Sequence, residues 1–193
     1  PKAFAGKKVH LPLNPETPTA QRARFFNSAD AFNLVLKPVP DKVFGKEANH
    51  AMSPNVATGY TECDSFLDSD EPGPSTSPFI LARYARINDG ESLEFSFNTI
   101  GSIWYVIKGC GTTSIANEEI AWSMGDVFVL PGGKKAILEA CGDDAILWVV
   151  TNEPQMAFEN TRPIDFSTSN IDIVHYPSAE IDRQVERVNR VEN

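Results

Sequence analysis

Side chains that could bind a catalytic metal or carry a proton are few and scattered in this chain. Of its 193 residues only three are histidines, and all three lie outside the segment 90–140, which has the most regular glycine and proline spacing: His10, His50 and His175. Each is interpreted as a surface or locally hydrogen-bonded imidazole. The three cysteines are widely spaced and form no CxxC pair, which predicts free thiols in a reducing compartment: Cys63, Cys110 and Cys141.

The segment 90–140 has a glycine and proline skeleton around four positions that could hold metal ligands. The skeleton is formed by Gly90, Gly109, Gly125, Pro131 and Gly133. The four positions are occupied by Ser96, Asn98, Ser102 and Ala136. A divalent metal needs three or four anionic or imidazole ligands, and hydroxyl or amide groups bind too weakly to replace them. A catalytic iron or zinc is therefore not expected here.

This skeleton resembles the two sequence motifs of the cupin superfamily. In the first motif, Ser96 and Asn98 stand at the positions of the two histidines, and Ser102 stands at the position of the glutamate. In the second motif, Ala136 takes the place of the last histidine. The resemblance implies an all-β fold, a cupin double-stranded β-helix or jelly-roll barrel, from which the ligands have been lost.

Alternation along the strand after Ser102 predicts which side chains face the barrel interior. Side chains two residues apart lie on one face of a strand, so Ser102, Trp104 and Val106 are expected to point inward together. A buried indole needs an acceptor for its N–H group. Trp104 either fills the core or forms a wall of a shared substrate pocket.

Short runs of β-branched and aromatic residues follow one another from residue 79 onward, with glycine, asparagine or aspartate between them. Eight such runs predict the strands of a jelly roll. Residues 79–193 are therefore assigned to one barrel with a C-terminal strand and helix. Residues 1–78 are assigned to an irregular arm and loop, with one short helix around 19–26, that packs on the barrel or on a partner.

The C-terminal helix is predicted to begin at a capping Ser178. Its apolar residues Ile181, Val185 and Val188 recur at helical spacing. A short amphipathic helix is marginal unless it docks. We expect its apolar stripe to lie on the barrel or on a partner chain, with the barrel favoured.

Charge and hydropathy exclude two classes of partner. The formal net charge is −9, with 17 basic and 26 acidic residues, and no basic run is present. Such a chain repels phosphates and anionic headgroups, so neither nucleic acid nor membrane is an expected partner. No apolar stretch approaches the roughly 20 residues that span a bilayer, and residues 1–10 have no signal-peptide core. A soluble cytoplasmic protein is expected.

Two segments after the barrel narrow the resemblance. TNEPQMAF (151–158) and HYPSAEIDRQV (175–185) are similar to the stretch after the first barrel of gentisate-type ring-cleaving cupins. A separate, ligand-free chain of this size is similar to the small, metal-free subunits of two-component hydroquinone 1,2-dioxygenases.

This resemblance implies a non-catalytic subunit of a heteromeric dioxygenase. Hydroquinone would be cleaved to 4-hydroxymuconic semialdehyde at Fe(II) held by a larger, ligand-bearing cupin subunit, in an α2β2 assembly. The present chain would hold no cofactor and no catalytic residue. Trp104 and Asn98 are the positions that the resemblance assigns to the substrate pocket for the phenol.

Two alternatives remain open. The chain could be an independent metal-free cupin acting as an isomerase or epimerase, or a cupin that binds a small ligand. An isomerase needs an acid–base group that faces the barrel interior. The segment 90–140 has no histidine, so this reading depends on Glu94, Glu139 or Tyr105.

Overall fold

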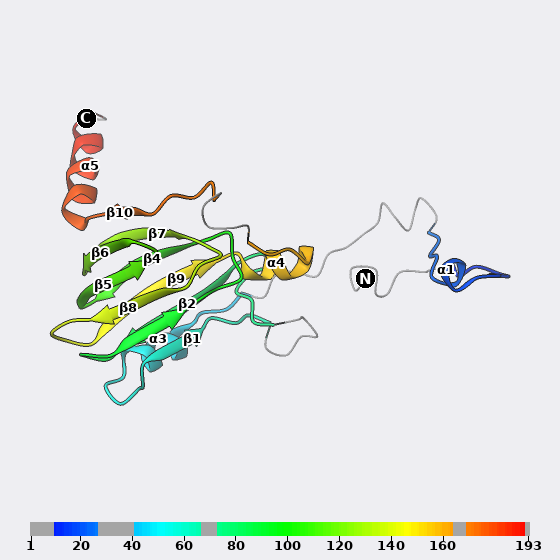
Figure 1. Ribbon diagram of the computed structural model, residues 1–193, viewed down its shortest axis with the longest axis horizontal. Helices are drawn as coiled ribbons and strands as arrows, with labels where there is room; N and C mark the ends of the chain where they lie inside the picture. Colours follow the sequence, from blue (N-terminus) through cyan, green and yellow to red (C-terminus); the bar gives the residue numbers. More distant parts are fainter. Residues whose placement is uncertain (1–9, 27–40, 67–72, 164–168, 192–193) are drawn as a thin grey trace. The chain divides into compact units, whose positions relative to one another are not determined.

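The computed structural model describes residues 10–26, 41–66, 73–163 and 169–191 (Figure 1). The chain divides into two compact units, Pro1–Pro38 and Val39–Asn193. In the first unit, Thr17 caps the short helix α1 (Pro18–Gln21), and its hydroxyl accepts the Ala20 N–H at 3.1 Å. This helix begins slightly earlier and ends sooner than the sequence predicted.

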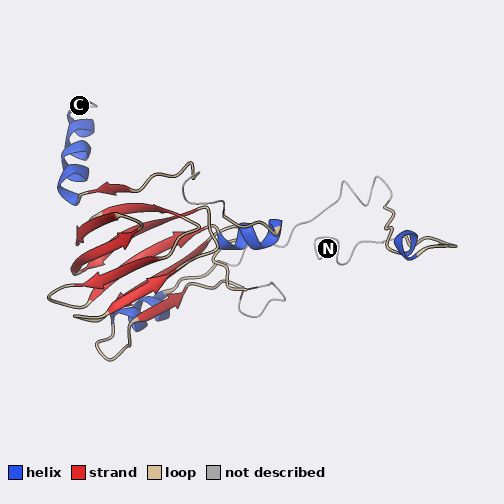
Figure 2. Ribbon diagram, viewed as in Figure 1, coloured by secondary structure: helices blue, strands red, loops and turns tan. Residues whose placement is uncertain are grey.

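The second unit is built from two antiparallel sheets (Figure 2). The larger sheet has the strand order β1-β2-β9-β4-β7-β10, and the smaller one has the order β3-β8-β5-β6. The strands are β1 (Gly59–Glu62), β2 (Leu81–Ile87), β3 (Ser92–Phe95), β4 (Gly101–Lys108), β5 (Cys110–Ile115), β6 (Glu118–Ser123), β7 (Val127–Pro131), β8 (Ala136–Ala140), β9 (Ala145–Thr151) and β10 (Val174–Tyr176). Strands β2 to β9 are the eight predicted from the sequence, and the all-β fold class, a jelly-roll sandwich, is confirmed.

The boundary between arm and barrel lies earlier than predicted. Helix α3 (Gly45–Met52) and strand β1 fall within residues 1–78, yet both belong to the barrel unit. Strand β1 pairs with β2, and α3 packs against these two strands, burying Ala51 completely. Local sequence did not show this, because β1 is a short strand that depends on pairing with β2 for its stability.

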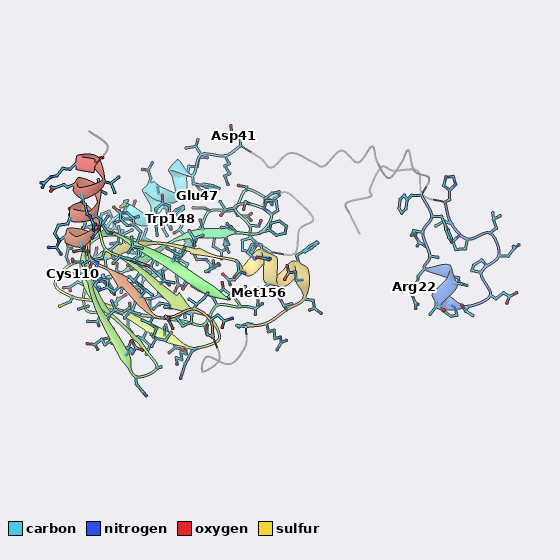
Figure 3. All side chains as sticks on the ribbon, turned by 90° about the horizontal axis from the view of Figure 1, so that it is seen from above. Arg22, Asp41, Glu47, Cys110, Trp148 and Met156 are labelled. Carbon is cyan, nitrogen blue, oxygen red and sulfur yellow. The ribbon has the colours of Figure 1, made fainter. Side chains whose placement is uncertain are left out.

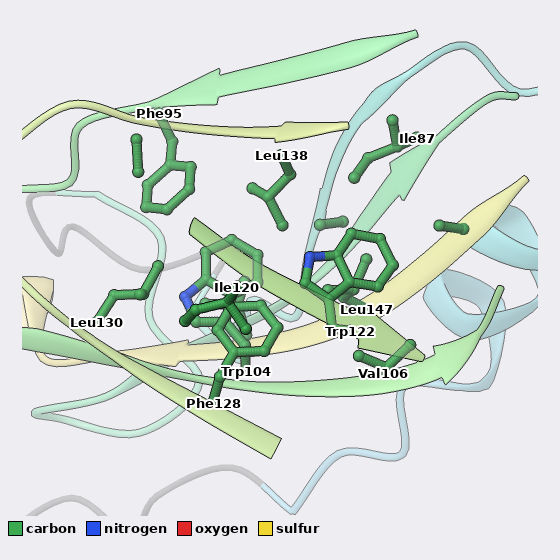
Figure 4. Packing of buried hydrophobic residues seen from close by; sticks show 14 of the residues in the cluster. Ile87, Phe95, Trp104, Val106, Ile120, Trp122, Phe128, Leu130, Leu138 and Leu147 are labelled. Carbon is green, nitrogen blue, oxygen red and sulfur yellow. The ribbon is translucent and has the colours of Figure 1, made fainter. Parts of the chain in front are cut away.

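The core lies between the two sheets and is rich in aromatic rings (Figure 4). Strand β4 alternates between buried and exposed side chains, as a strand with one face on the core does. Both sheets contribute fully or nearly fully buried residues, among them Trp104, Val106, Phe128, Leu130 and Leu147 from the larger sheet and Phe95, Ile115, Trp122 and Leu138 from the smaller one. Burial of each large apolar side chain contributes about 1.5–3 kcal/mol.

Two further helices follow the last long strand. Helix α4 (Glu153–Glu159) comes directly after β9, and α5 (Ser178–Val191) follows β10 (Figure 1). The predicted C-terminal helix is present, but its apolar stripe is not covered by the barrel, because Val185 and Val188 are 54% and 53% exposed. Within the described residues, no helix is long and apolar enough to cross a membrane.

Candidate functional site

The barrel interior at Ser102 is the first part of the candidate site, because the resemblance to cupin motifs places a metal ligand at this position. Ser102 lies on β4 between Leu130 of β7 and Thr151 of β9, and it is 3% exposed. Its Oγ accepts a hydrogen bond from Nε1 of Trp104 at 2.8 Å. The indole therefore takes its acceptor from the position where the resemblance places a metal-binding glutamate.

Trp104 occupies the interior beside Ser102. It is fully buried, and its ring stacks on Phe128 at a centroid distance of 5.7 Å and an interplanar angle of 7°. The Phe95 ring lies 4.9 Å from it on another side. The prediction that Ser102, Trp104 and Val106 face inward is confirmed. The packing favours the reading of Trp104 as core, and its assignment to a substrate pocket stays a prediction.

Strand β3 places different residues inside from those that the motif spacing indicated. Phe95 is buried opposite Ala136, and Phe97 packs partly buried against the same core. Ser96 and Asn98 alternate with them and are exposed. The side chains at the two expected histidine positions thus point outward. The register of β3 on β8 places Phe95 on the inward face, and residues one position away in the chain lie on the opposite face.

Asn98 makes only a marginal contact in this arrangement. Its Nδ2 lies 3.5 Å from the carbonyl oxygen of Thr161. Ala136, the fourth former ligand position, is fully buried at the start of β8 and faces the core. The assignment of Asn98 to a substrate pocket also stays a prediction.

These interior residues do not fit a metal ion. Phe95, Phe97 and Ala136 offer no donor atom, and the Ser102 oxygen already accepts the indole N–H. Iron and zinc prefer imidazole, carboxylate or thiolate ligands. In the part of the chain that the structure describes, no group of three or more His, Cys, Asp or Glu residues is placed to hold a metal.

A charged cluster lies at the α4 end of the same interior. Arg83 on β2 lies on the same face of the strand as the core residues Ala85 and Ile87, and it is 4% exposed. Its Nη1 lies 2.7 Å from Oε2 of Glu153, the first residue of α4, and its Nη2 lies 3.6 Å from Oε1 of Glu62. The Nη1–H bond is not aimed at the carboxylate, so this contact is an ion pair rather than a hydrogen bond.

The cluster joins the charged groups to the aromatic core. The Arg83 guanidinium lies 4.4 Å from the centroid of the Phe97 ring. The Thr151 hydroxyl donates a hydrogen bond to Glu153 at 2.7 Å. The two carboxylates neutralise the charge of the buried guanidinium and hold it in place. Because they outnumber the one cation, the cluster has a net negative charge and does not attract an anion.

Tyr60 completes this cluster from β1. Its hydroxyl is buried and has no hydrogen-bond partner among the described residues. Burial raises the pKa of the Tyr60 phenol well above its usual range, although the nearby positive charge of Arg83 acts in the opposite direction. The phenol is therefore protonated at neutral pH and is a donor, not a base.

Sequence reasoning missed this cluster. Its one local signal is Arg83, a charged residue on the face of strand LARYARI that also carries the core residues Ala85 and Ile87. Glu62, Tyr60 and Glu153 lie on other elements, and only the fold brings them to Arg83.

Fold and site together define a class: a jelly-roll barrel whose interior is filled by aromatic rings. No protein-family model matches the chain. The 5-aminosalicylate 1,2-dioxygenase of a Comamonas species is 33% identical to it over 84 residues, which is 44% of this chain and 22% of that protein. The chain thus matches well under half the length of this relative, and the resemblance to gentisate-type ring-cleaving cupins is confirmed at the level of the group.

The chain also aligns with parts of solved structures, at TM-scores below 0.5. Salicylate 1,2-dioxygenase of Pseudoaminobacter salicylatoxidans aligns with a TM-score of 0.46 and 18% identity, covering 58% of this chain and 30% of that one. The EutQ protein of Clostridium difficile aligns with a TM-score of 0.36 and 23% identity, covering 41% of this chain and 60% of that one.

Proposed function

We propose that this chain is the non-catalytic, metal-free cupin subunit of a heteromeric dioxygenase that opens an aromatic ring. One observation carries the proposal: a barrel with similarity to a ring-cleaving dioxygenase has phenylalanine, serine and alanine where ligands would be needed. The metal, Fe(II), belongs on a larger, ligand-bearing cupin partner, where it supplies the redox chemistry.

Within this proposal, the chain contributes a rigid barrel to the complex. Trp104, Phe95 and Phe128 fill the volume that a metal and its substrate would otherwise occupy. The ion pair of Arg83 with Glu153 ties α4 to the interior at one end. The expected substrate is a phenol, with hydroquinone as the specific candidate and 4-hydroxymuconic semialdehyde as its product.

The two residues assigned to the substrate pocket, Asn98 and Trp104, differ in their exposure. Asn98 is exposed, and its amide, which has only a 3.5 Å contact with the Thr161 carbonyl oxygen, would meet a substrate held by the partner. Trp104 is enclosed by contacts with the rings of Phe95 and Phe97. It would therefore shape a substrate pocket indirectly, through its packing against these rings, and would contact a substrate only after they move.

Exposed apolar side chains support a partner chain. Ile103 and Tyr105, on the outer face of β4, are 55% and 45% exposed. The stripe of α5 adds Val185 and Val188, with Tyr176 beside them along a groove. Apolar surface grouped in this way is typical of an interface, and the proposed occupant is the larger subunit of an α2β2 assembly.

Native mass spectrometry with metal analysis tests the proposal on protein isolated from its own source. The expected result is a complex with a second, larger chain, with iron following that chain when the two are separated. Stoichiometric iron on the isolated small chain, together with ring cleavage by it alone, contradicts the proposal. A metal-free homo-oligomer with no second chain also contradicts it and favours an independent isomerase or ligand-binding cupin.

A further inference from the structure

Two of the three cysteines lie directly opposite each other at the end of the barrel away from α4. Gly111 pairs with Ala140 at the end of the ladder between β5 and β8, and Cys110 and Cys141 are the residues one step beyond this pair. The Cys141 N–H donates to the Cys110 carbonyl at 3.0 Å, and the Cys110 thiol donates to the Cys141 carbonyl at 2.9 Å. Figure 3 shows Cys110 at the opposite end of the barrel from Met156 of α4.

Both thiols lie on the outer face of the smaller sheet. Gly111 and Ala140 are buried, so the side chains of the residues next to them alternate outward, and both cysteines are exposed. Opposite residues of an antiparallel pair have Cα atoms about 4.5–5.5 Å apart. A disulfide needs Cα atoms about 4.4–6.8 Å apart, a separation that such a pair supplies without a change of fold.

The backbone around the pair is held on both sides. A Cβ atom at Gly109, whose φ is +83°, would approach the Asp144 carbonyl oxygen to 2.8 Å, so the two segments pass each other closely. Beyond the pair, Lys108 forms an ion pair with Asp143 at 3.2 Å. The two cysteines therefore stay opposite each other in the folded chain.

We propose that Cys110 and Cys141 form a reversible intramolecular disulfide by exchange with a low-molecular-weight disulfide such as oxidised glutathione. One thiolate attacks the small disulfide, which forms a mixed disulfide and releases one small thiol. The second thiolate attacks the protein sulfur of that bond, which closes the Cys110–Cys141 bond and releases the other small thiol. The two protein thiols are oxidised, and the small disulfide is reduced to two thiols.

The bond would fasten the β8–β9 turn to the start of β5. Asp144 in this turn pairs with the buried Arg86, whose Nη1 also donates to the Ala51 carbonyl of α3 at 3.0 Å. A disulfide across this sequence separation of 31 residues restricts the unfolded chain. We expect oxidation to raise the Tm by about 5 °C or more. This modification site does not depend on the proposed function.

Peptide mapping of the folded chain treated with oxidised glutathione tests the site. Trypsin cleavage after Lys108, Lys134 and Lys135 places Cys110 and Cys141 in separate peptides, which a disulfide would join. Because folding holds the thiols together, the linked form should exceed the mixed disulfide by more than about tenfold. The same treatment in urea should give mainly mixed disulfides.

Three single variants complete the experiment. Cys63 is fully buried, so Cys63→Ser should keep the linked peptides and the rise in Tm. Cys110→Ser and Cys141→Ser should each accumulate a glutathione adduct on the remaining partner and lose the rise in Tm. Mixed disulfides on both cysteines of the folded wild type, or a linked fraction no greater than in urea, would overturn the proposal.

Discussion

At the scale of single residues, a buried indole occupies the barrel interior beside Ser102. The Nε1 donor of Trp104 and the Oγ acceptor of Ser102 satisfy each other in a site closed to water. Trp122 and Thr113 repeat this arrangement, with an N–H to Oγ1 distance of 2.9 Å, elsewhere in the same core. Both indoles thus bury their rings without leaving a donor unpaired.

Ser102→Ala should destabilise the fold by about 1–3 kcal/mol, because it leaves the buried indole N–H without a partner. In a Trp104→Phe background, which has no indole N–H, Ser102→Ala should change the free energy of unfolding by about zero. Urea unfolding of the four proteins of this cycle measures the coupling. Ser96→Ala is the matched control, since Ser96 is exposed. If Ser102→Ala costs no more than Ser96→Ala, this hydrogen bond does not stabilise the core.

At the scale of elements, one aspartate holds the C-terminal strand and helix in addition to the pairing of β10 with β7. Asp126, which is 4% exposed, accepts the Ser178 N–H at 2.8 Å and the Ser123 N–H at 2.9 Å, and it lies 3.0 Å from Nε2 of His175. The sequence assigned the cap of this helix to Ser178. In the structure, α5 begins at Ser178, and the carboxylate of Asp126 caps it from the start of β7.

This attachment should depend on pH. Burial alone would raise the pKa of Asp126, but the N–H donors of Ser178 and Ser123 and the His175 imidazole outweigh it, so the pKa lies below its ordinary 3.8. The stabilisation is therefore fully present above the ordinary pKa and is lost as the pH falls through the lowered one.

Asp126→Asn should lower the free energy of unfolding at pH 7 by about 1.5–3 kcal/mol, the usual worth of hydrogen bonds to a charged group. The difference from wild type should shrink as the pH falls from 3.8 through the lowered pKa, where the native carboxylate becomes protonated. Urea unfolding at pH 7 and over this acidic range measures the change, and hydrogen exchange should show faster opening of residues 174–191. Asp172→Asn, at an exposed position of the same segment, is the control. A difference that persists unchanged at low pH contradicts this role of Asp126.

At the scale of the whole molecule, the proposed partner should cover the stripe of α5. Val185→Gln with Val188→Gln should leave the isolated chain folded, since both side chains are already half exposed. The same double substitution should raise the Kd of the complex with the larger chain at least about tenfold, which corresponds to a loss of about 1.4 kcal/mol of binding free energy. Titration of the small chain into the large one, read by native mass spectrometry, measures this.

Arg183→Gln with Arg187→Gln is the matched control, because these residues lie on the opposite side of the helix. It should leave the complex unchanged. Equal affinity for the valine variant and the wild type would show that the partner does not bind this stripe.

The sequence by itself determined the eight barrel strands, the inward face of β4 and the presence of a C-terminal helix. Each of these features depends on local spacing: alternation with period two, glycines at the turns, and apolar residues at helical intervals. The absence of imidazole and carboxylate side chains at the four motif positions could also be read directly from the residue types.

The tertiary structure alone decided which residues meet across strands. The register of β3 on β8 turned Phe95 inward and exposed Ser96. Pairing of β5 with β8 placed Cys110 beside Cys141, which is 31 residues later in the chain. In the same way Asp126 contacts Ser178, which is 52 residues later. No local pattern specifies such contacts, because register and sheet order depend on the burial of the whole core and not on the spacing within one strand.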